Sequence, residues 1–252
     1  MSKEAEMPGK EVSQDQLRVI FGRYYFASKF VSGKKVLEVG CGTGIGLGYL
    51  AKKAKKIVGI DISADNLNIA KAHYKNTRRI ELFRLNAHNL SFFKPKSFDV
   101  IIAMATVYAL NLEEFLKECQ RILKKSGKLI FCLPNKDQPG FQPAKLSTKY
   151  YSVPELFTVL NKYKFNPKIF AAFPITKSLL RQRGISNFLN SMIGGSIIRK
   201  FLNKVFLHKI SLEPEITEKD MNLVKDIKFV PLKPNLTNSQ YRILYVIAQK
   251  KI

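Results

Sequence analysis

The residues with the clearest chemical potential lie in the stretch VLEVGCGTG, residues 36–44. It begins with branched apolar residues, which are typical of a strand buried on both faces. Gly40, Gly42 and Gly44 follow, and glycines allow a sharp turn and a close approach of the backbone to a ligand. The segment 45–53 is predicted to be a helix, so the stretch predicts a strand, turn and helix corner that suits a nucleotide-like ligand.

Two acidic residues add chemistry to this corner. Glu38 interrupts the apolar strand, and a carboxylate buried there requires a hydrogen-bonding or positively charged partner. Asp61 ends a second apolar run, 56–62, roughly 20 residues after Gly40. At the carboxyl end of the neighbouring strand, its carboxylate can accept hydrogen bonds from ribose hydroxyls. The alternative is that Asp61 only caps the next helix, but the glycine corner upstream favours ribose binding.

A dinucleotide site is a competing interpretation of the glycines. The dehydrogenase fingerprint GxGxxG would place its third glycine at position 45, which is Ile45. A shifted match, Gly46-x-Gly48-x-x-Ala51, falls inside the predicted helix and is interpreted as a matter of packing.

The charge of the chain points to an anionic partner. Its 252 residues include 43 Lys and Arg against 19 Asp and Glu, a formal charge of +24. Such a balance predicts contact with RNA, an acidic membrane surface or an anionic substrate. A compositional preference for lysine, which is spread along the chain, explains the charge equally well.

The cysteine and histidine content predicts no metal site. Three cysteines and three histidines are widely spaced, without a CxxC or HxxxH motif. The cysteines fit buried thiols of a cytoplasmic protein. No apolar run reaches the roughly 18 residues of a transmembrane helix, and the N-terminal residues lack the apolar core of a signal peptide. We therefore expect a cytoplasmic location, with peripheral membrane contact as a further interpretation of the charge.

Strand and helix patterns alternate along most of the chain. Strands are predicted at residues 35–39, 56–62, 80–85, 99–103, 128–133, 168–173 and 242–248, and helices at 14–30, 45–53, 64–74, 111–123 and 153–162. This alternation predicts an α/β fold with a mainly parallel sheet. Residues 1–13 are predicted to be disordered, 14–252 to form one domain, and 174–240 to be an insertion before the last strand. Ser63 is predicted to cap the helix 64–74, and Gly127 to end the helix 111–123 in the left-handed conformation.

Five segments in order resemble the motifs of class I S-adenosylmethionine-dependent methyltransferases. They are VLEVGCGTG, VGIDIS, LNAHNLSF, SFDVIIA and RILKKSGKLIFCLPN, within residues 14–173. The pattern is most similar to the type 11 group, which includes ubiquinone-type and sugar-modifying enzymes. A weaker resemblance links NKDQPGFQPAKLSTKYYSVPEL to bacterial methyltransferases associated with polysaccharide synthesis.

The resemblance implies a Rossmann-like sheet of seven strands with an antiparallel last strand, and S-adenosyl-L-methionine as cofactor, with S-adenosyl-L-homocysteine as product. It also implies that Gly40, Cys41 and Gly42 approach the methionine and ribose parts of the cofactor. Glu38 would hold the corner and reach toward the cofactor's ammonium group.

The same resemblance assigns further cofactor contacts. Asp61 would bind the ribose hydroxyls, and Ile62 would pack on the adenine. Asn86 stands where the family often has Asp, and it would reach the adenine edge beside Ala87, since an amide also forms hydrogen bonds. Met104 would line the methionine arm.

No catalytic residue is evident from the sequence. The weak candidates are His88, Tyr108 and Asp137, each with a structural alternative: a loop histidine, a wall tyrosine and a turn aspartate. Arg23 and Tyr24, on the N-terminal helix, either close over the cofactor or serve in packing and on a solvated face; the two interpretations have equal weight.

The insertion contains one amphipathic segment, SIIRKFLNKVFLHK, residues 196–209. Its apolar residues share one helical face and its basic residues the other. Such a helix either lies on an anionic membrane or forms a lid on the domain, and the lid is favoured.

Three functions remain open on the sequence alone. The leading one is direct methyl transfer to an oxygen or nitrogen atom of a small or carrier-linked acceptor, a sugar among them. The second is methylation of RNA, suggested by the charge. The third is a non-catalytic membrane-surface or partner-binding module, against which the intact glycine corner speaks. The sequence does not indicate the oligomeric state.

Overall fold

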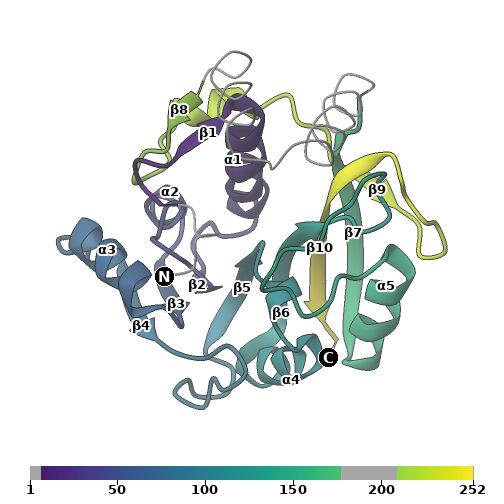
Figure 1. The fold of residues 1–252 in the computed structure, drawn as a ribbon. Coiled ribbons are helices and arrows are strands. Elements are labelled where there is room, and N and C mark those ends of the chain that lie inside the picture. Colours follow the sequence, from purple (N-terminus) through teal and green to yellow (C-terminus); the bar gives the residue numbers. More distant parts are fainter. Residues whose placement is uncertain (1–6, 177–208, 252) are drawn as a thin grey trace.

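The computed structural model describes residues 7–176 and 209–251. Its centre is an eight-stranded mixed sheet with the strand order β4-β3-β2-β5-β6-β10-β7-β9 (Figure 1). In chain order these strands are β2 (Lys35–Val39), β3 (Lys56–Asp61), β4 (Ile80–Arg84), β5 (Phe98–Met104), β6 (Leu123–Pro134), β7 (Phe165–Pro174), β9 (Val230–Leu232) and β10 (Tyr241–Lys250). Neighbours from β4 to β6 are parallel, so their carboxyl ends meet at one edge of the sheet.

The end of the chain completes the sheet in the predicted way. β10 lies between β6 and β7 and runs antiparallel to both, which confirms the antiparallel last strand. The prediction of seven strands is wrong by one. β9, from the insertion, adds an antiparallel edge strand to β7. Pro231 lies in β9, and an edge strand tolerates proline because one side of it needs no backbone donor.

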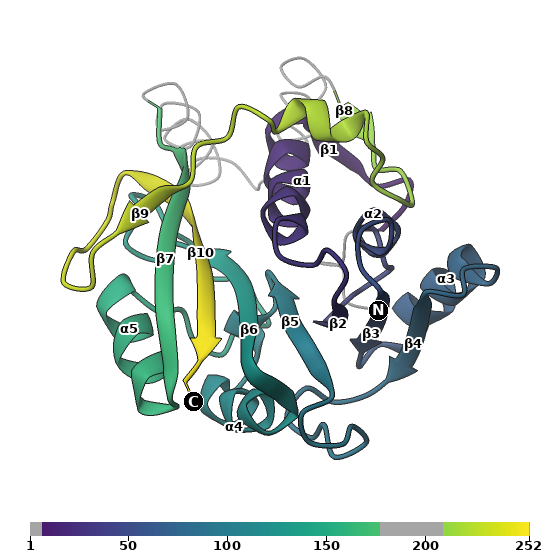
Figure 2. The same cartoon turned by 180° about the vertical axis from the view of Figure 1, so that it is seen from behind.

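Helices cover both faces of the sheet (Figure 2). They are α1 (Gln14–Ser28), α2 (Leu47–Ala51), α3 (Ala64–Tyr74), α4 (Leu112–Ile122) and α5 (Val153–Lys162). Side chains alternate along β5: Val100 and Ile102 belong to the core under α1 and α2, whereas Ile101 and Ala103 belong to the core under α4 and α5. A strand apolar on both faces is what a sheet covered on both sides requires.

The N-terminal segment is more ordered than its composition suggests. The prediction of disorder for residues 1–13 is wrong for β1 (Glu11–Ser13), which pairs antiparallel with β8 (Lys209–Ser211). Ser13 then caps α1 in a reciprocal capping box with Gln16. The strand forms because its partner arrives from the far end of the chain, which local composition does not reveal.

The described part of the insertion, residues 209–240, packs on α1. Besides β8 and β9 it contains one short 3-10 helix, η2 (Asp220–Leu223). Four of its side chains are buried in the same core as α1: Leu212, Ile216, Met221 and Val224. The basic helix predicted for residues 196–209 lies outside the described residues, apart from Lys209 at the start of β8. No helix in the described ranges is long and apolar enough to cross a bilayer.

Two local predictions are wrong. α2 begins at Leu47 rather than at residue 45 and ends at Ala51, so the helix after the glycine corner is one short turn. Ser126, not Gly127, takes the left-handed conformation after α4, with φ of 59°. At position 127 a side chain would be too close to its neighbours, because a Cβ there would lie 3.0 Å from the Lys124 carbonyl oxygen.

Candidate functional site: a cofactor cleft at the strand ends

A cleft of about 520 Å³ opens at the carboxyl ends of β2, β3 and β5. Ligands of open α/β sheets bind at this edge, where neighbouring strands diverge. Twelve of the fourteen residues proposed for the site line the cleft: Arg23, Tyr24, Gly40, Cys41, Gly42, Asp61, Ile62, Asn86, Ala87, His88, Met104 and Tyr108. Glu38 and Asp137 do not.

The glycine corner is held against the end of β3. The backbone N–H groups of Gly40 and Cys41 both donate to the Ile60 carbonyl oxygen, at 2.8 and 3.0 Å. Gly40 has φ of +70°, and a Cβ there would lie 2.5 Å from Thr106 Oγ1. Gly42 has φ of +56°, and nothing lies within 4 Å of where its Cβ would be. At Gly42 the backbone is therefore open to a ligand, as a cofactor cradle requires.

Asp61 is the best-anchored acidic group in the cleft. Its Oδ2 accepts the Gly42 N–H and its Oδ1 accepts the Ser63 N–H, both at 2.8 Å. Ser63 caps α3, accepting the Asn66 N–H at 3.3 Å, so the prediction for Ser63 is confirmed and the capping alternative for Asp61 is wrong. Each carboxylate oxygen has further lone pairs, which leaves Asp61 able to accept hydrogen bonds from a diol.

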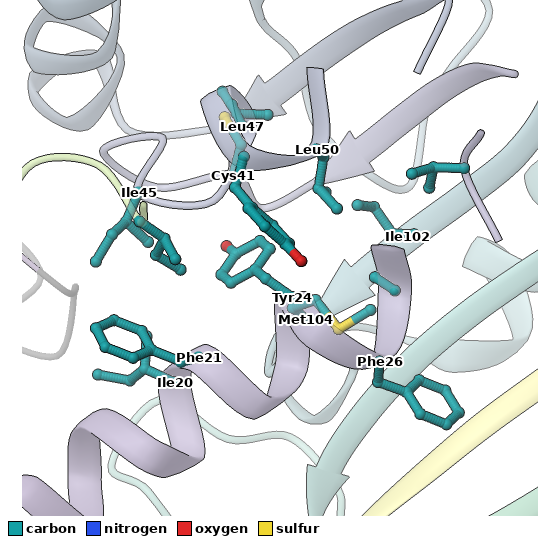
Figure 3. Packing of buried hydrophobic residues seen from close by; sticks show 14 of the residues in the cluster. Ile20, Phe21, Tyr24, Phe26, Cys41, Ile45, Leu47, Leu50, Ile102 and Met104 are labelled. Carbon is teal, nitrogen blue, oxygen red and sulfur yellow. The ribbon is translucent and has the colours of Figure 1, made fainter. Parts of the chain in front are cut away.

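Glu38 lies beneath the corner rather than in the cleft. It is 1% exposed, and its Oε1 accepts a hydrogen bond from the Tyr24 hydroxyl at 3.0 Å. The predicted polar partner of Glu38 is thus confirmed, and it comes from α1. Figure 3 shows Tyr24 projecting from α1 toward the segment that carries Cys41 and Ile45.

The glycines of the shifted fingerprint serve packing, as predicted. A Cβ on Gly46 would lie 1.9 Å from the Tyr24 ring, and one on Gly48 would lie 2.1 Å from the Glu215 carboxylate. Glu215 itself lies 3.1 Å from His73 Nε2, which ties the described part of the insertion to α3. These glycines admit neighbouring side chains rather than a pyrophosphate.

The thiol of Cys41 lines the cleft without being reactive. Burial, followed by the negative charges of Glu38 and Asp61, raises the pKa of this thiol well above its usual value. The side chain is therefore a neutral, apolar part of the wall.

His88 has a structural contact that bears on its candidacy as a base. Its Nε2 accepts the Asn111 N–H at 2.9 Å, at the start of α4. Because the donor is a backbone amide, Nε2 carries no proton and the neutral ring is protonated on Nδ1. His88 can accept a proton only by giving up this contact, so the loop role is favoured.

The other two catalytic candidates differ in position. Tyr108 lines the cleft in η1 (Val107–Ala109) and stacks on Tyr150 with ring centroids 5.0 Å apart. Asp137 lies in the turn after β6, where its N–H donates to Asn135 Oδ1 at 3.2 Å. Its absence from the cleft wall favours the turn role.

Comparison with known proteins identifies the architecture. Residues 37–131 match the model of the methyltransferase domain family. The ubiquinone biosynthesis O-methyltransferase of Idiomarina loihiensis is 30% identical over 107 residues, which are 42% of this chain and 44% of that protein. The chain thus spans about half the length, or less, of the curated relatives it matches. The match to the family model assigns residues 37–131 to the methyltransferase domain family.

Solved structures agree on the fold of this chain. A methyltransferase from Archaeoglobus fulgidus aligns with a TM-score of 0.59 at 18% identity, covering 94% of this chain and 95% of that one. A [4+2]-cyclase aligns with a TM-score of 0.57 at 17% identity, covering 98% and 86% of the two chains. At these identities the likeness shows the fold alone, so the acceptor must be inferred from the cleft.

The cleft fits S-adenosyl-L-methionine, the cofactor that the match to the methyltransferase domain implies. Asp61 suits the ribose diol, and Ile62, 66% exposed at the cleft wall, offers an apolar surface for the adenine. Asn86 Oδ1 accepts the His88 N–H at 3.0 Å and keeps a second lone pair for an adenine amino group. Among the described residues, no group of three or more His, Cys, Asp or Glu side chains could hold a metal ion.

Thr106 and Leu146 are among the residues of the cleft wall that were not predicted from the sequence. Thr106 donates from Oγ1 to the Met104 carbonyl oxygen at 3.1 Å and packs against Gly40. Leu146 is 62% exposed and reaches the cleft from the loop after β6. A lone apolar residue in a polar loop is the only sequence signal for Leu146.

Proposed function

We propose that the chain transfers a methyl group from S-adenosyl-L-methionine directly to an oxygen or nitrogen atom of a small or carrier-linked acceptor, a sugar being one candidate class. The observation that carries the proposal is the placement of Asp61, anchored by two backbone amides, beside an open glycine corner. The O-methyltransferases among the relatives support an oxygen acceptor.

The cofactor supplies a methyl group on a positively charged sulfonium, and the protein's task is to hold the acceptor in line with it. Such positioning contributes roughly 7–11 kcal/mol in favourable cases. In this proposal Asp61 orients the ribose, Ile62 the adenine, and the corner at Gly40 and Gly42 fixes the methionine arm. Arg23 and Tyr24, on α1, exclude water from the same cleft.

Calorimetry with S-adenosyl-L-homocysteine tests the cofactor assignment directly. Binding by the folded wild-type chain, weakened in Asp61→Ala, is expected. A folded sample that binds neither cofactor nor product contradicts the proposal. Transfer of a radiolabelled methyl group into fractionated lysate then shows whether the label enters carbohydrate, lipid or RNA.

RNA is a second candidate acceptor, favoured by the formal charge of +24. Binding to RNA would then weaken steeply with salt, because counterions are released from the phosphates. Binding that is absent, or that does not respond to salt, removes this candidate.

An acidic membrane surface is the other anionic partner that the charge suggests. Co-sedimentation with anionic vesicles, compared with neutral vesicles, tests whether the chain binds to a membrane surface.

A further inference from the structure

A second cleft, of about 540 Å³, lies along the N-terminal part of α1. It is bounded by the N-terminal segment, by the carboxyl end of β6 at Pro134 and by the start of β10 at Arg242 and Ile243. Its volume is in the range of about 300–1,000 Å³ that is usual for small-molecule sites. The described residues that line it include polar, charged and apolar side chains in similar measure.

The two clefts share a wall. Arg23 lines both of them. The loop after β6 also lines both clefts. Gln138, Phe141 and Gln142 line the second cleft, and Leu146 lines the cofactor cleft. A ligand held in the second cleft therefore meets the cofactor cleft at Arg23.

This loop is fixed to the cofactor cleft by hydrogen bonds and ring contacts. The carbonyl oxygen of Tyr108 accepts the Thr148 N–H at 2.7 Å and the Thr148 hydroxyl at 3.0 Å. Tyr150 stacks on Tyr108, and Phe141 meets Tyr150 edge-on with centroids 4.7 Å apart. A chain of three rings thus leads from one cleft to the other.

The walls of the second cleft suit a ring that is apolar on its faces and polar around its rim. Phe141, Val19 and Ile243 supply apolar surface. The Arg242 guanidinium group donates to both Asp15 carboxylate oxygens, at 2.6 and 2.7 Å, in a bidentate ion pair. The two charges therefore neutralise each other. Gln142 contributes an amide, which both donates and accepts. The wall carries both carboxylates, Glu11 and Asp15, and cations, Lys10, Arg23 and Arg242. Sugar hydroxyl groups can bond to all of these groups and to amides, because a hydroxyl both donates and accepts hydrogen bonds.

We propose that the second cleft binds a pyranose ring of the methyl acceptor and presents one of its hydroxyl groups to the cofactor cleft past Arg23. This inference rests on the proposed function and names the substrate class for it. Phe141 stacks on the sugar ring, and Gln142 bonds to its hydroxyl groups. Both are binding residues, distant from the cofactor contacts of Asp61.

The test uses saturation-transfer NMR on the full chain saturated with S-adenosyl-L-homocysteine, with a set of neutral methyl pyranosides as probes. Signals are expected from at least one pyranoside with the wild type, and at least a tenfold weaker affinity is expected in Phe141→Ala and in Gln142→Ala. For both variants, the Kd of S-adenosyl-L-homocysteine measured by calorimetry should lie within twofold of the wild-type value. Phe92→Ala, an exposed phenylalanine that lines neither cleft, is the matched control and should change neither reading.

The outcomes separate the two proposals. Failure of the wild type to bind S-adenosyl-L-homocysteine contradicts the proposed function itself. Product binding without any pyranoside signal overturns the sugar site alone, and so do signals that persist in both variants. The Gln142→Ala variant covers the case in which loss of the Phe141 ring disturbs the loop. Because Gln142 is exposed, its substitution is expected to leave the loop in place.

Discussion

The cofactor cleft and the second cleft are built in different ways. Most of the cofactor cleft comes from residues 39–110, at the ends of adjacent parallel strands, and is held by backbone hydrogen bonds. The second cleft gathers residues 10–23, 134–142, 212 and 242–243. The match to the methyltransferase domain covers residues 37–131 and includes none of the second cleft. The residues matched by the family model thus contain most of the cofactor cleft, whereas the acceptor site that we propose lies outside them.

The sharpest way to test this division is Asp61→Ala. The change removes two anchored oxygens and, with them, two charge-assisted hydrogen bonds to the ribose, so we expect the Kd of S-adenosyl-L-homocysteine to rise about 100-fold, or about 2.7 kcal/mol. Calorimetry measures it, with Asp65→Ala, in the first turn of α3, as control. Unchanged affinity in Asp61→Ala would refute the ribose role.

A second test contrasts two glycines of the cofactor half. In Gly46→Ala the new methyl group meets the Tyr24 ring, so we expect the free energy of unfolding to fall by about 2–3 kcal/mol. In Gly42→Ala there is space, and only the positive φ opposes the change, by about 1–2 kcal/mol. Urea unfolding measures both. Equal losses would contradict the distinction between a packing glycine and a cradle glycine.

The loop after β6, which lines the second cleft, is tied to α5 by an ion pair. The Lys136 ammonium group donates to the Glu155 carboxylate at 2.6 Å. Burial opposes ionisation of Glu155, but the bonds from Lys136 and Ser152 lower its pKa to about 2. A carboxyl with a depressed pKa stabilises the fold above its unfolded pKa of about 4.3. That contribution is lost as the pH falls toward 2.

We therefore expect Glu155→Gln to reduce the free energy of unfolding above about pH 5 by at most about 1 kcal/mol, since this side chain is 40% exposed and screened by water. The difference from the wild type should shrink between about pH 4.3 and 2. Unfolding curves across this range measure it, and the capping role of position 155 is kept by Gln. A difference that stays constant with pH would show that the ion pair does not hold the loop.

The smallest effect is expected at Tyr245 on β10, in the core that contains α1. Its ring packs between Phe26 and Phe229, and its hydroxyl is buried without a hydrogen-bond partner among the described residues. Removing a buried, unsatisfied hydroxyl is close to neutral or stabilising. Tyr245→Phe should therefore leave the free energy of unfolding within about 0.5 kcal/mol or raise it slightly. A loss above about 1 kcal/mol would reveal a partner for this hydroxyl.

The sequence by itself predicted the periodic elements closely. β2, α3 and α5 have the predicted bounds, and α4 is one residue shorter at each end. The cofactor-binding corner could also be predicted from the sequence. Its strands end at one edge of a parallel sheet, and Asp61 follows Gly40 at a fixed spacing. These features depend on local periodicity and on the few conformations open to glycine.

Only the tertiary structure decided the rest. The β1 strand, the contact between His88 and α4, and the second cleft all join segments far apart in the chain. Asp137 belongs to a turn rather than to the cofactor cleft because of where the loop after β6 packs. Spacing along the chain sets which residues share a strand or a helix face, but packing between distant segments sets which of them meet.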